Sequence, residues 1–279
     1  MGVITLLTDF GHTDSYVGVM KGVIAGISPH SQVIDLTHGI LTQDILAARF
    51  NLLTSYGYFP GGTVHGVVVD PGVGTQRAAV AVQVAAANGA HMVVAPDNGI
   101  LTGFPITAAV ALVNADYWRT SRPSHTFHGR DIFAPIAAHL ANGVPLAQMG
   151  TSMSISNLVT LPLGDTMATG HGYTGSIQYI DHFGNLVTTI GGDRLTSPSW
   201  HVWVGQGIVR SSSTYGHVPP GKALALIGSH GYVEIAVNGG SAAQVFGATV
   251  GDEVELVTRP MGRTGGRFDA PIEPTDGLF

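Results

Sequence analysis

The sequence contains no cysteine and unusually little charge. The absence of cysteine excludes disulfide bonds, thiolate metal sites and a cysteine nucleophile. Charged residues make up 11% of the 279 residues, against about 25% in an average soluble protein. A chain this poor in charge must either bury an unusual share of its surface or cover part of it with copies of itself. We therefore expect a homo-oligomer.

Basic residues are scarce as well, and long apolar runs are absent. The chain has 12 Lys and Arg against 18 Asp and Glu, which gives a formal net charge of −6. Because nucleic-acid affinity rests mainly on cationic contacts with phosphates, we expect no nucleic-acid partner. No apolar run reaches the ~18–20 residues that span a bilayer, and residues 1–7 lack the charged start of a signal peptide. We expect no membrane partner and a cytoplasmic location.

Familiar nucleotide-binding and nucleophile motifs are also missing. The sequence has no Walker A loop and no Gly-x-Ser-x-Gly elbow. Residues 170–175 match the Gly-x-Gly-x-x-Gly string, but a strand pattern follows them where a dinucleotide-binding motif requires a helix. We therefore expect no nucleoside triphosphate, no dinucleotide and no other cofactor.

The first 165 residues alternate short apolar runs with helical patterns. This alternation predicts an α/β domain, residues 1–165, with a mainly parallel central sheet and crossover helices. Two predicted helices take Asp14 and Thr42 as N-caps, a third begins near Phe127, and a short one follows residue 99. The predicted strands are residues 3–7, 33–36, 63–69, 78–84 and 91–95.

From residue 172 the pattern changes to short β-rich runs separated by Gly, Ser and Pro turns, without a helical period. It predicts a smaller all-β, barrel-like domain over residues 172–258. The domain boundary is expected between Pro162 and Gly172, and residues 259–279 are expected to form an irregular tail. The predicted strands are residues 176–181, 186–190, 200–204, 223–227, 232–237 and 253–257.

Acidic residues recur at the ends of predicted strands in the first domain. Ligands of open α/β sheets bind at the carboxyl ends of the strands, so this recurrence indicates a binding site, although any single acid can also form a turn. Asp70 and Arg77 flank a Gly-rich turn that can bring their side chains together. Alone, this pair favours a salt bridge that holds a loop, because such pairs are common. The strand-end acids are Asp9, Asp35, Asp70 and Asp97.

A group of histidines raises the possibility of a metal site. His125, His128, Asp131 and His139 lie close in sequence, but the chain has 13 histidines and no His-Glu-x-x-His or comparable ligand set. We therefore expect no metal. A metal-dependent hydrolase built on His125, His128 and Asp131 stays as an alternative.

Two polar loops with aromatic residues lie in the predicted β domain, at residues 181–185 and 228–232. Both are typical of hairpin turns. The first also offers Phe183 as a stacking surface and Asn185 as an amide that can donate to and accept from a base edge.

Several strings taken together make the sequence resemble one family. Val69 to Gly74, for example, reads Val-Asp-Pro-Gly-Val-Gly, and residues 127–131 read Phe-His-Gly-Arg-Asp. In these strings and their order the sequence is similar to the S-adenosyl-L-methionine hydroxide adenosyltransferases, relatives of fluorinase and chlorinase, from about residue 4 to 257. The matching strings are residues 8–11, 14–22, 69–74, 96–99, 127–131, 181–185 and 234–238.

The resemblance implies hydrolysis of S-adenosyl-L-methionine to adenosine and L-methionine, without a cofactor. It also implies an N-terminal α/β domain, a C-terminal β domain and a homotrimer with active sites between subunits. Asp70, Arg77 and His128 would activate the attacking water.

The resemblance assigns the substrate-binding residues as well. Asp9 would hold the ribose hydroxyls, and Asp14 in the N-terminal string is a further candidate. Asp181 and Ser229 would receive the amino and carboxylate groups of the methionine part. Adenine would be held by Phe183, Asn185 and the backbone at Val237 and Gly239.

Departures from the halogenating relatives argue against halogenation. Fluorinase carries a tyrosine where Asp70 stands and a halide-contacting serine where Gly129 stands, and an anionic Asp70 would repel halide. The remaining alternatives are a non-catalytic protein that binds S-adenosylmethionine or adenosine and, less favoured, a chlorinase or the metal-dependent hydrolase.

The oligomer is directly testable. Light scattering of the purified protein should give three times the mass of one chain. A monomer mass at working concentration would contradict the homo-oligomer expected from the low charge content and the trimer implied by the resemblance.

Overall fold

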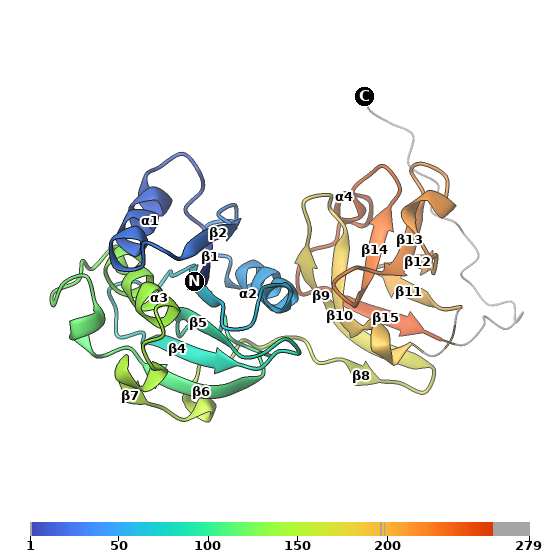
Figure 1. The fold of residues 1–279 in the computed structure, drawn as a ribbon. Helices are drawn as coiled ribbons and strands as arrows, with labels where there is room; N and C mark the ends of the chain where they lie inside the picture. Colours follow the sequence, from blue (N-terminus) through green and yellow to red (C-terminus); the bar gives the residue numbers. More distant parts are fainter. Residues whose placement is uncertain (1, 196, 198, 259–279) are drawn as a thin grey trace, which may run out of the picture. The chain divides into compact units, whose positions relative to one another are not determined.

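The computed structural model describes residues 2–195, 197 and 199–258. The chain divides into two compact units, Met1–Leu161 and Pro162–Phe279, and we describe each by itself (Figure 1). The predicted irregular tail, residues 259–279, lies outside the described residues. In the described part of the chain, no helix combines the length and the apolar character needed to cross a membrane.

A seven-stranded mixed sheet forms the centre of the N-terminal unit. Its strands run in the order β2-β1-β3-β5-β4-β6-β7. The pairs β1–β2, β1–β3 and β3–β5 are parallel, whereas β5–β4, β4–β6 and β6–β7 are antiparallel. The strands are β1 (Val3–Thr8), β2 (Gln32–Thr37), β3 (Val64–Val68), β4 (Ala79–Val84), β5 (His91–Pro96), β6 (Ile106–Ala111) and β7 (Thr151–Ser152).

The predicted α/β unit is therefore confirmed, but the prediction of a mainly parallel sheet holds for only half of it. Residues 85–90 alone join β4 to β5. A parallel pair needs a crossover of about a dozen or more residues, so this short connection makes the two strands antiparallel. The sequence analysis also missed β6, and the short helix predicted after residue 99 is a run of turns.

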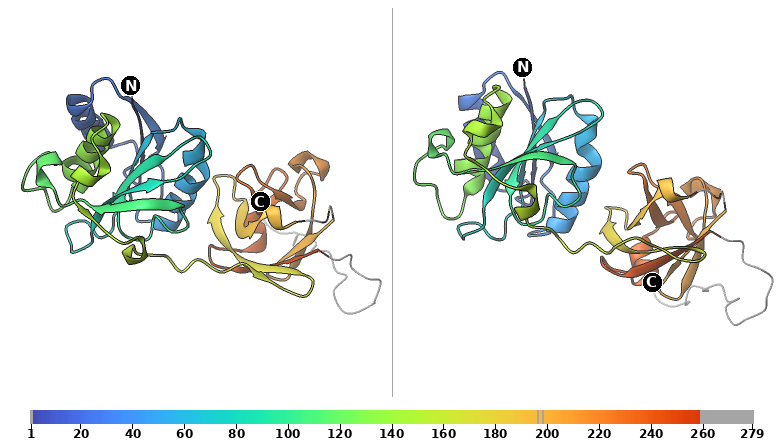
Figure 2. Two further views of the ribbon diagram at one scale, coloured as in Figure 1. Left: turned by 60° about the horizontal axis from the view of Figure 1, so that its bottom comes forward. Right: turned by 90° about the horizontal axis from the view of Figure 1, so that it is seen from below.

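Helices cover both faces of this sheet (Figure 2). α1 (Tyr16–Ile27) and α3 (Ala134–Ala141) pack on one face, and α2 (Ile45–Ser55) lies on the other. The predicted N-caps were wrong. α1 begins after Ser15, whose side chain makes no capping bond. α2 is capped by Asp44. Asp44 Oδ1 accepts a hydrogen bond at 2.8 Å from the N–H of Ala47, three residues later.

Alternation along the strands builds the core of this unit. Ile4 and Leu6 of β1 are fully buried in the same cluster as Met20 and Ile24 of α1 and Ile136 of α3. Since successive side chains of a strand point to opposite faces, the intervening residues of β1 face α2 instead. This packing on both faces positions the carboxyl end of β1, from which the next loop starts.

The C-terminal unit is a nearly closed antiparallel barrel, as the sequence predicted. Its strands run β12-β11-β15-β9-β10-β14-β13, and β8 pairs with β9. Ser212 N–H donates to the Ala225 carbonyl at 2.8 Å, which joins the segment after β12 to β13. The strands are β8 (Met167–Ala168), β9 (Gly172–Ile180), β10 (Leu186–Gly191), β11 (His201–Val204), β12 (Gly207–Arg210), β13 (Ala223–Ile227), β14 (Tyr232–Val237) and β15 (Glu253–Val257).

A short helix, α4 (Ala242–Phe246), interrupts this β unit. Five residues are too few to show a helical period in sequence, so the pattern did not predict it. Ser241 caps its start by accepting from the Gln244 N–H, and Gly247 ends it in the left-handed conformation.

A chain of buried histidines connects three strands of the N-terminal unit. Thr5 Oγ1 lies 2.7 Å from His65 Nδ1, His65 Nε2 lies 3.2 Å from His91 Nδ1, and His91 Nε2 lies 3.0 Å from Asn88 Oδ1. The Asn88 amide nitrogen donates to two carbonyls, so its oxygen must accept from His91. It follows that Thr5 donates to His65 and His65 donates to His91, with both imidazoles neutral.

This chain predicts acid sensitivity. Burial, together with the neighbouring His91, lowers the pKa of His65 from 6.5 to about 3. Below pH 6.5 the unfolded chain binds a proton here that the folded chain excludes, so stability falls as the pH falls toward 3. At 1.36 kcal/mol per pH unit, this one group removes up to about 3 kcal/mol between pH 6.5 and about pH 4.

Urea unfolding across this pH range measures the effect. His65→Leu should flatten the acid slope relative to the unsubstituted chain, whereas His30→Gln, at an exposed histidine, should leave it unchanged. Equal slopes in all three proteins would contradict the prediction.

Candidate functional site

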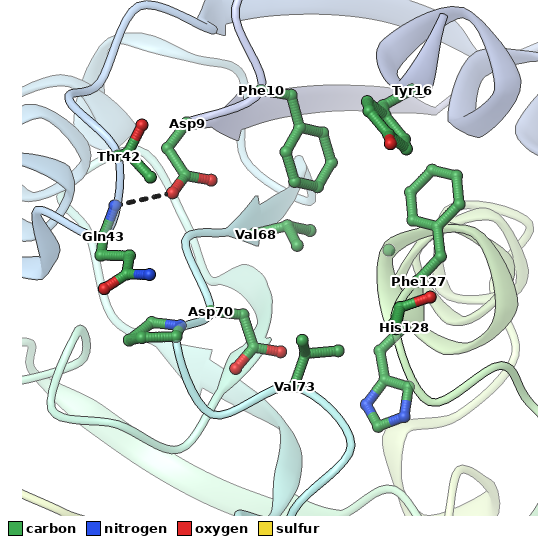
Figure 3. A pocket seen from close by; sticks show the side chains of 13 residues that line it. Asp9, Phe10, Tyr16, Thr42, Gln43, Val68, Asp70, Val73, Phe127 and His128 are labelled. Carbon is green, nitrogen blue, oxygen red and sulfur yellow. Dashed lines mark hydrogen bonds between the residues drawn. The ribbon is translucent and has the colours of Figure 1, made fainter.

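Loops at the carboxyl ends of β1 and β3 line a cavity of about 370 Å³ (Figure 3). Asp9 and Phe10 follow β1, and Asp70 follows β3. Of the other two acids predicted at strand ends, Asp35 lies within β2 and Asp97 follows β5, and neither lines the cavity. The remaining lining residues are Tyr16, Thr42, Gln43, Val68, Pro71, Val73, Thr126, Phe127, His128 and Gly129.

Arg77 joins Asp70 and His128 at the edge of this cavity. Its Nε donates to Asp70 Oδ1 at 2.9 Å, and its Nη2 donates to Asp70 Oδ2. The same Nη2 donates to His128 Nδ1 at 3.0 Å. The Arg77 and Asp70 side chains are only 8% and 5% exposed, so this pair is not a solvated surface bridge. The structure thus brings the three residues together from segments 51 positions apart.

These contacts fix the protonation of His128. A guanidinium can only donate, so His128 Nδ1 must accept, and the neutral imidazole carries its proton on Nε2. Burial and then the positive charge of Arg77 lower the pKa of His128 below its usual value. The imidazole is therefore neutral at neutral pH.

The segment that carries His128 has no strand or helix of its own between residues 118 and 127. This segment packs against Gly74 in the loop after β3. The φ of Gly74 is +77°, and a Cβ atom at this position would lie 2.3 Å from the His125 carbonyl oxygen. Only glycine permits this close approach. His128 then leads into a π-helical turn, Gly129–Phe133, which continues as α3. Such turns are frequent at functional sites.

Asp131 holds that segment in place. Its carboxylate, 1% exposed, accepts from Arg119 Nε, from Arg130 Nε and Nη2 at 2.8 Å, and from Ser124 N–H at 2.8 Å. Burial alone would raise the pKa of Asp131, but these hydrogen bonds and the Arg119 charge hold it well below the usual range. Arg130 also lies over the Phe127 ring, 5.3 Å from its centroid. One carboxylate therefore fixes both ends of the segment.

Asp131 is thus unsuited to the metal site considered from the sequence. Both its oxygens already accept from cationic or backbone donors. In the described ranges of the chain, no three His, Cys, Asp or Glu side chains gather as metal ligands would.

Asp9 is held by backbone contacts on the other side of the cavity. Its Oδ2 accepts from the Gln43 N–H at 2.8 Å. The preceding Thr8 contacts the buried His38, with Oγ1 and Nδ1 2.9 Å apart, and Gly11 N–H donates to the His38 carbonyl. Asp14, in contrast, is exposed in the turn before α1 and does not line the cavity.

Sequence reasoning missed an aromatic wall on this cavity. Phe10, Tyr16 and Phe127 meet in pairs, with ring centroids 5.1–5.9 Å apart. All three lie in the sequence segments that resemble the family, but no pattern indicated that they line a cavity. They separate the cavity from an adjoining one of about 360 Å³, which Ser124 and Arg130 also line. Gln43 was missed too, because nothing in the sequence places residue 43 beside residue 9.

In the C-terminal unit, the predicted residues 181–185 form a tight turn between β9 and β10. Asp181 Oδ1 accepts from the N–H groups of Phe183 and Asn185, and its Oδ2 accepts from Asn185 Nδ2 at 2.8 Å. This orients the Asn185 amide and leaves the Phe183 ring 71% exposed. The hairpin interpretation is therefore correct: the turn exposes Phe183, whereas Asn185 is buried.

The other predicted residues of this unit lie at the two ends of β14. Val237 ends the strand and Gly239 follows it, next to the same turn, since Leu186, just after the turn, pairs with Ile235 of β14. Ser229 lies before the start of β14, exposed in the β13–β14 hairpin. Ser229 is thus not brought together with the turn.

A buried cluster missed by the sequence analysis supports the β13–β14 hairpin. Glu234 is 3% exposed and accepts from Tyr215 Oη at 2.7 Å, and its other oxygen lies 3.1 Å from His230 Nε2. Burial and the Glu234 carboxylate raise the pKa of Tyr215. The cluster fixes His230, the neighbour of Ser229.

The Asp131 contacts generate a prediction. Asp131→Asn should destabilise the protein by roughly 2–3 kcal/mol, less than the about 3–5 kcal/mol of fully buried pairs, because Arg119 and Arg130 are partly exposed. Urea unfolding at pH 7 measures this. Asp116→Asn, at an exposed aspartate in the same region, is the matched control and should stay within about 0.5 kcal/mol. Equal losses in the two variants would refute the assigned role of Asp131.

Comparisons with known proteins agree on one family. The SAM hydroxide adenosyltransferase N-terminal domain model matches residues 4–150, and the C-terminal domain model matches residues 175–255. An (R)-S-adenosyl-L-methionine hydrolase of Salinispora tropica is 40% identical, covering 91% of this chain and 97% of the relative. One of Thermus thermophilus is 38% identical, covering 92% and 100%.

Structure comparison and more distant relatives point the same way. The crystal structure of an uncharacterized conserved protein from Thermotoga maritima has a TM-score of 0.83 and 36% identity, covering 91% of this chain and 99% of that one. A fluorinase of Actinopolyspora mzabensis is more distant, at 28% identity over 91% of this chain and 96% of the relative. With both domain models matched along most of its length, the chain belongs to the SAM hydroxide adenosyltransferase family.

Proposed function

We propose that the protein hydrolyses S-adenosyl-L-methionine to adenosine and L-methionine. The observation that carries this proposal is the contact of Asp70, Arg77 and His128 at the edge of a cavity. Membership of the family and the hydrolases of Salinispora tropica and Thermus thermophilus support the same activity.

The cavity suits a cationic substrate. Two carboxylates, Asp9 and Asp70, line it, and the His128 imidazole is neutral. The rings of Phe10, Tyr16 and Phe127 add π-faces, which attract cations. A sulfonium group meets these requirements, and Asp70 offers a proton acceptor, which water needs as a nucleophile and halide does not. This favours water over halide as the nucleophile.

In the proposed reaction, a water oxygen attacks the ribose C5′ in line with the carbon–sulfur bond. The C5′–O bond forms as the C5′–S bond breaks, and methionine leaves as a neutral thioether. Excluding bulk water strengthens the attraction between the developing hydroxide and the sulfonium and holds the attack geometry. The proton released by the water must pass to a group beside it.

Asp70 is the proposed proton acceptor. His128 has no lone pair to offer, since Nδ1 accepts from Arg77 and Nε2 carries the proton. The Asp70 carboxylate keeps further lone pairs while accepting from Arg77. In this scheme Arg77 favours the developing hydroxide electrostatically, and His128 Nε2–H orients the water.

Substrate-binding roles complete the proposal. Asp9 would hold the ribose hydroxyls. Phe183, Asn185 and the backbone of Val237 and Gly239 would hold adenine. Asp181 would receive the methionine part, and Ser229 and Asp14 would contribute further substrate contacts. We also propose a homotrimer in which residues of two subunits complete each active site, while a cytoplasmic location remains a prediction that cell fractionation would test.

Product analysis tests the activity. Purified protein incubated with S-adenosyl-L-methionine, with and without chloride, should give adenosine and methionine in equal amounts. Substrate binding without product would favour the non-catalytic alternative, and a halogenated nucleoside would favour a halogenase.

Two substitutions test the assigned roles. Asp70→Asn should lower kcat by about 10²–10⁴-fold with little change in KM, because it removes the proton acceptor and keeps the side-chain shape. His128→Asn should lose less, because the carboxylate remains. Asp116→Asn serves as the control. A larger loss for His128→Asn than for Asp70→Asn would assign the proton to the imidazole instead.

A further inference from the structure

Gln43 has a backbone conformation that residues with a side chain rarely adopt. Its φ is +66°, and every other described residue with positive φ is a glycine. The Cβ atom of an L-residue is crowded in this left-handed region, whereas glycine occupies it freely. Gln43 also lines the cavity, and such conformations cluster at functional sites. A glutamine at this position therefore carries a local cost that a glycine would avoid.

The backbone of Gln43 is anchored on both sides. Its N–H donates to Asp9 Oδ2 at 2.8 Å, and its carbonyl accepts from the Ile45 N–H at 3.0 Å, at the first residue of α2. The next residue, Asp44, caps α2. The left-handed turn thus links the Asp9 carboxylate to the helix, and a glycine could make the same backbone contacts.

The side chain of Gln43 enters the cavity from this turn. Figure 3 shows it on the same wall as Asp9, with its amide pointing toward the space between Asp9 and Asp70. Within the part of the chain that the structure describes, no side chain or backbone group is hydrogen-bonded to this amide. Its two N–H donors are available to a ligand.

We propose that Gln43 is a specificity-determining residue that reads the ribose diol together with Asp9. The inference rests on the proposed function, because it takes the ribose of S-adenosyl-L-methionine as the ligand. One hydroxyl donates to Asp9, and its neighbour accepts from the Gln43 amide.

The chemistry of a vicinal diol requires both partners. Each hydroxyl is a donor and an acceptor, whereas a carboxylate only accepts. Asp9 alone would satisfy the hydroxyl protons and leave the oxygen lone pairs without a donor. The Gln43 amide supplies that donor, and it supplies it close to the carboxylate because the Gln43 N–H binds the same Asp9.

Gln43→Gly is the informative substitution. It removes the amide but suits the left-handed conformation, so the N–H bond to Asp9 should persist and stability should hold or rise. Gln43→Glu keeps the length and removes the donors. Leu41→Gly is the matched control: it adds flexibility to the same turn at a side chain that is 76% exposed and outside the cavity lining.

The measurement compares S-adenosyl-L-methionine with its 2′-deoxy and 3′-deoxy analogues. On the full substrate, Gln43→Gly and Gln43→Glu should raise KM about tenfold and change kcat less than about threefold. On the analogue lacking the hydroxyl that Gln43 reads, unsubstituted protein and Gln43→Gly should have the same KM. Leu41→Gly should discriminate between the substrates like the unsubstituted protein.

Two outcomes overturn the inference: an unchanged KM in Gln43→Gly, or the same KM increase on all three substrates. Calorimetric binding of adenosine and its 2′-deoxy and 3′-deoxy forms separates this failure from that of the proposed function. If the unsubstituted protein makes no adenosine from S-adenosyl-L-methionine, the proposed function fails, but a hydroxyl preference in binding that Gln43→Gly abolishes would still support the role of Gln43.

Discussion

The site depends on the hydrogen bonds of the Arg77 guanidinium. The guanidinium donates to the Asp70 carboxylate and to His128 Nδ1 while the Arg77 and Asp70 side chains are nearly excluded from solvent. This single cation pairs with the Asp70 carboxylate and helps keep the His128 imidazole neutral. A buried carboxylate without that partner would be strongly destabilising. The chemistry of the cavity edge and its stability therefore come from the same hydrogen bonds.

The segment that holds His128 against Arg77 must be ordered without a helix or strand, because residues 118–127 have no regular structure. Two features order it. Gly74 lets the segment approach the loop after β3 closely, and the buried Asp131 collects donors from three places along the segment. The adjoining π-helical turn connects the segment directly to α3, which packs on the sheet. Precision at the site is thus supplied by polar contacts behind it.

The opposite wall of the cavity follows a different principle. Asp9 is oriented by a backbone N–H of a strained turn rather than by a cation, so its charge is not neutralised by an adjacent guanidinium. One carboxylate beside an arginine and one beside an amide give a cavity with a negative lining and an aromatic wall. This asymmetry suits a ligand that carries both a positive centre and hydroxyl groups.

The sequence by itself determined the α/β and barrel units and most strands, because local patterns carry that information, and its resemblance to the family offered Asp70, Arg77 and His128 as candidates. It could not determine that half of the first sheet is antiparallel, since only the six residues between β4 and β5 decide the direction of that pair. The sequence also left open whether Asp70 and Arg77 merely hold a loop. The tertiary structure alone brought His128 to them, placed Gln43 beside Asp9 and separated Ser229 from the turn at Asp181. The two contacts join residues 51 and 34 positions apart, and packing rather than local propensity decides which distant segments meet.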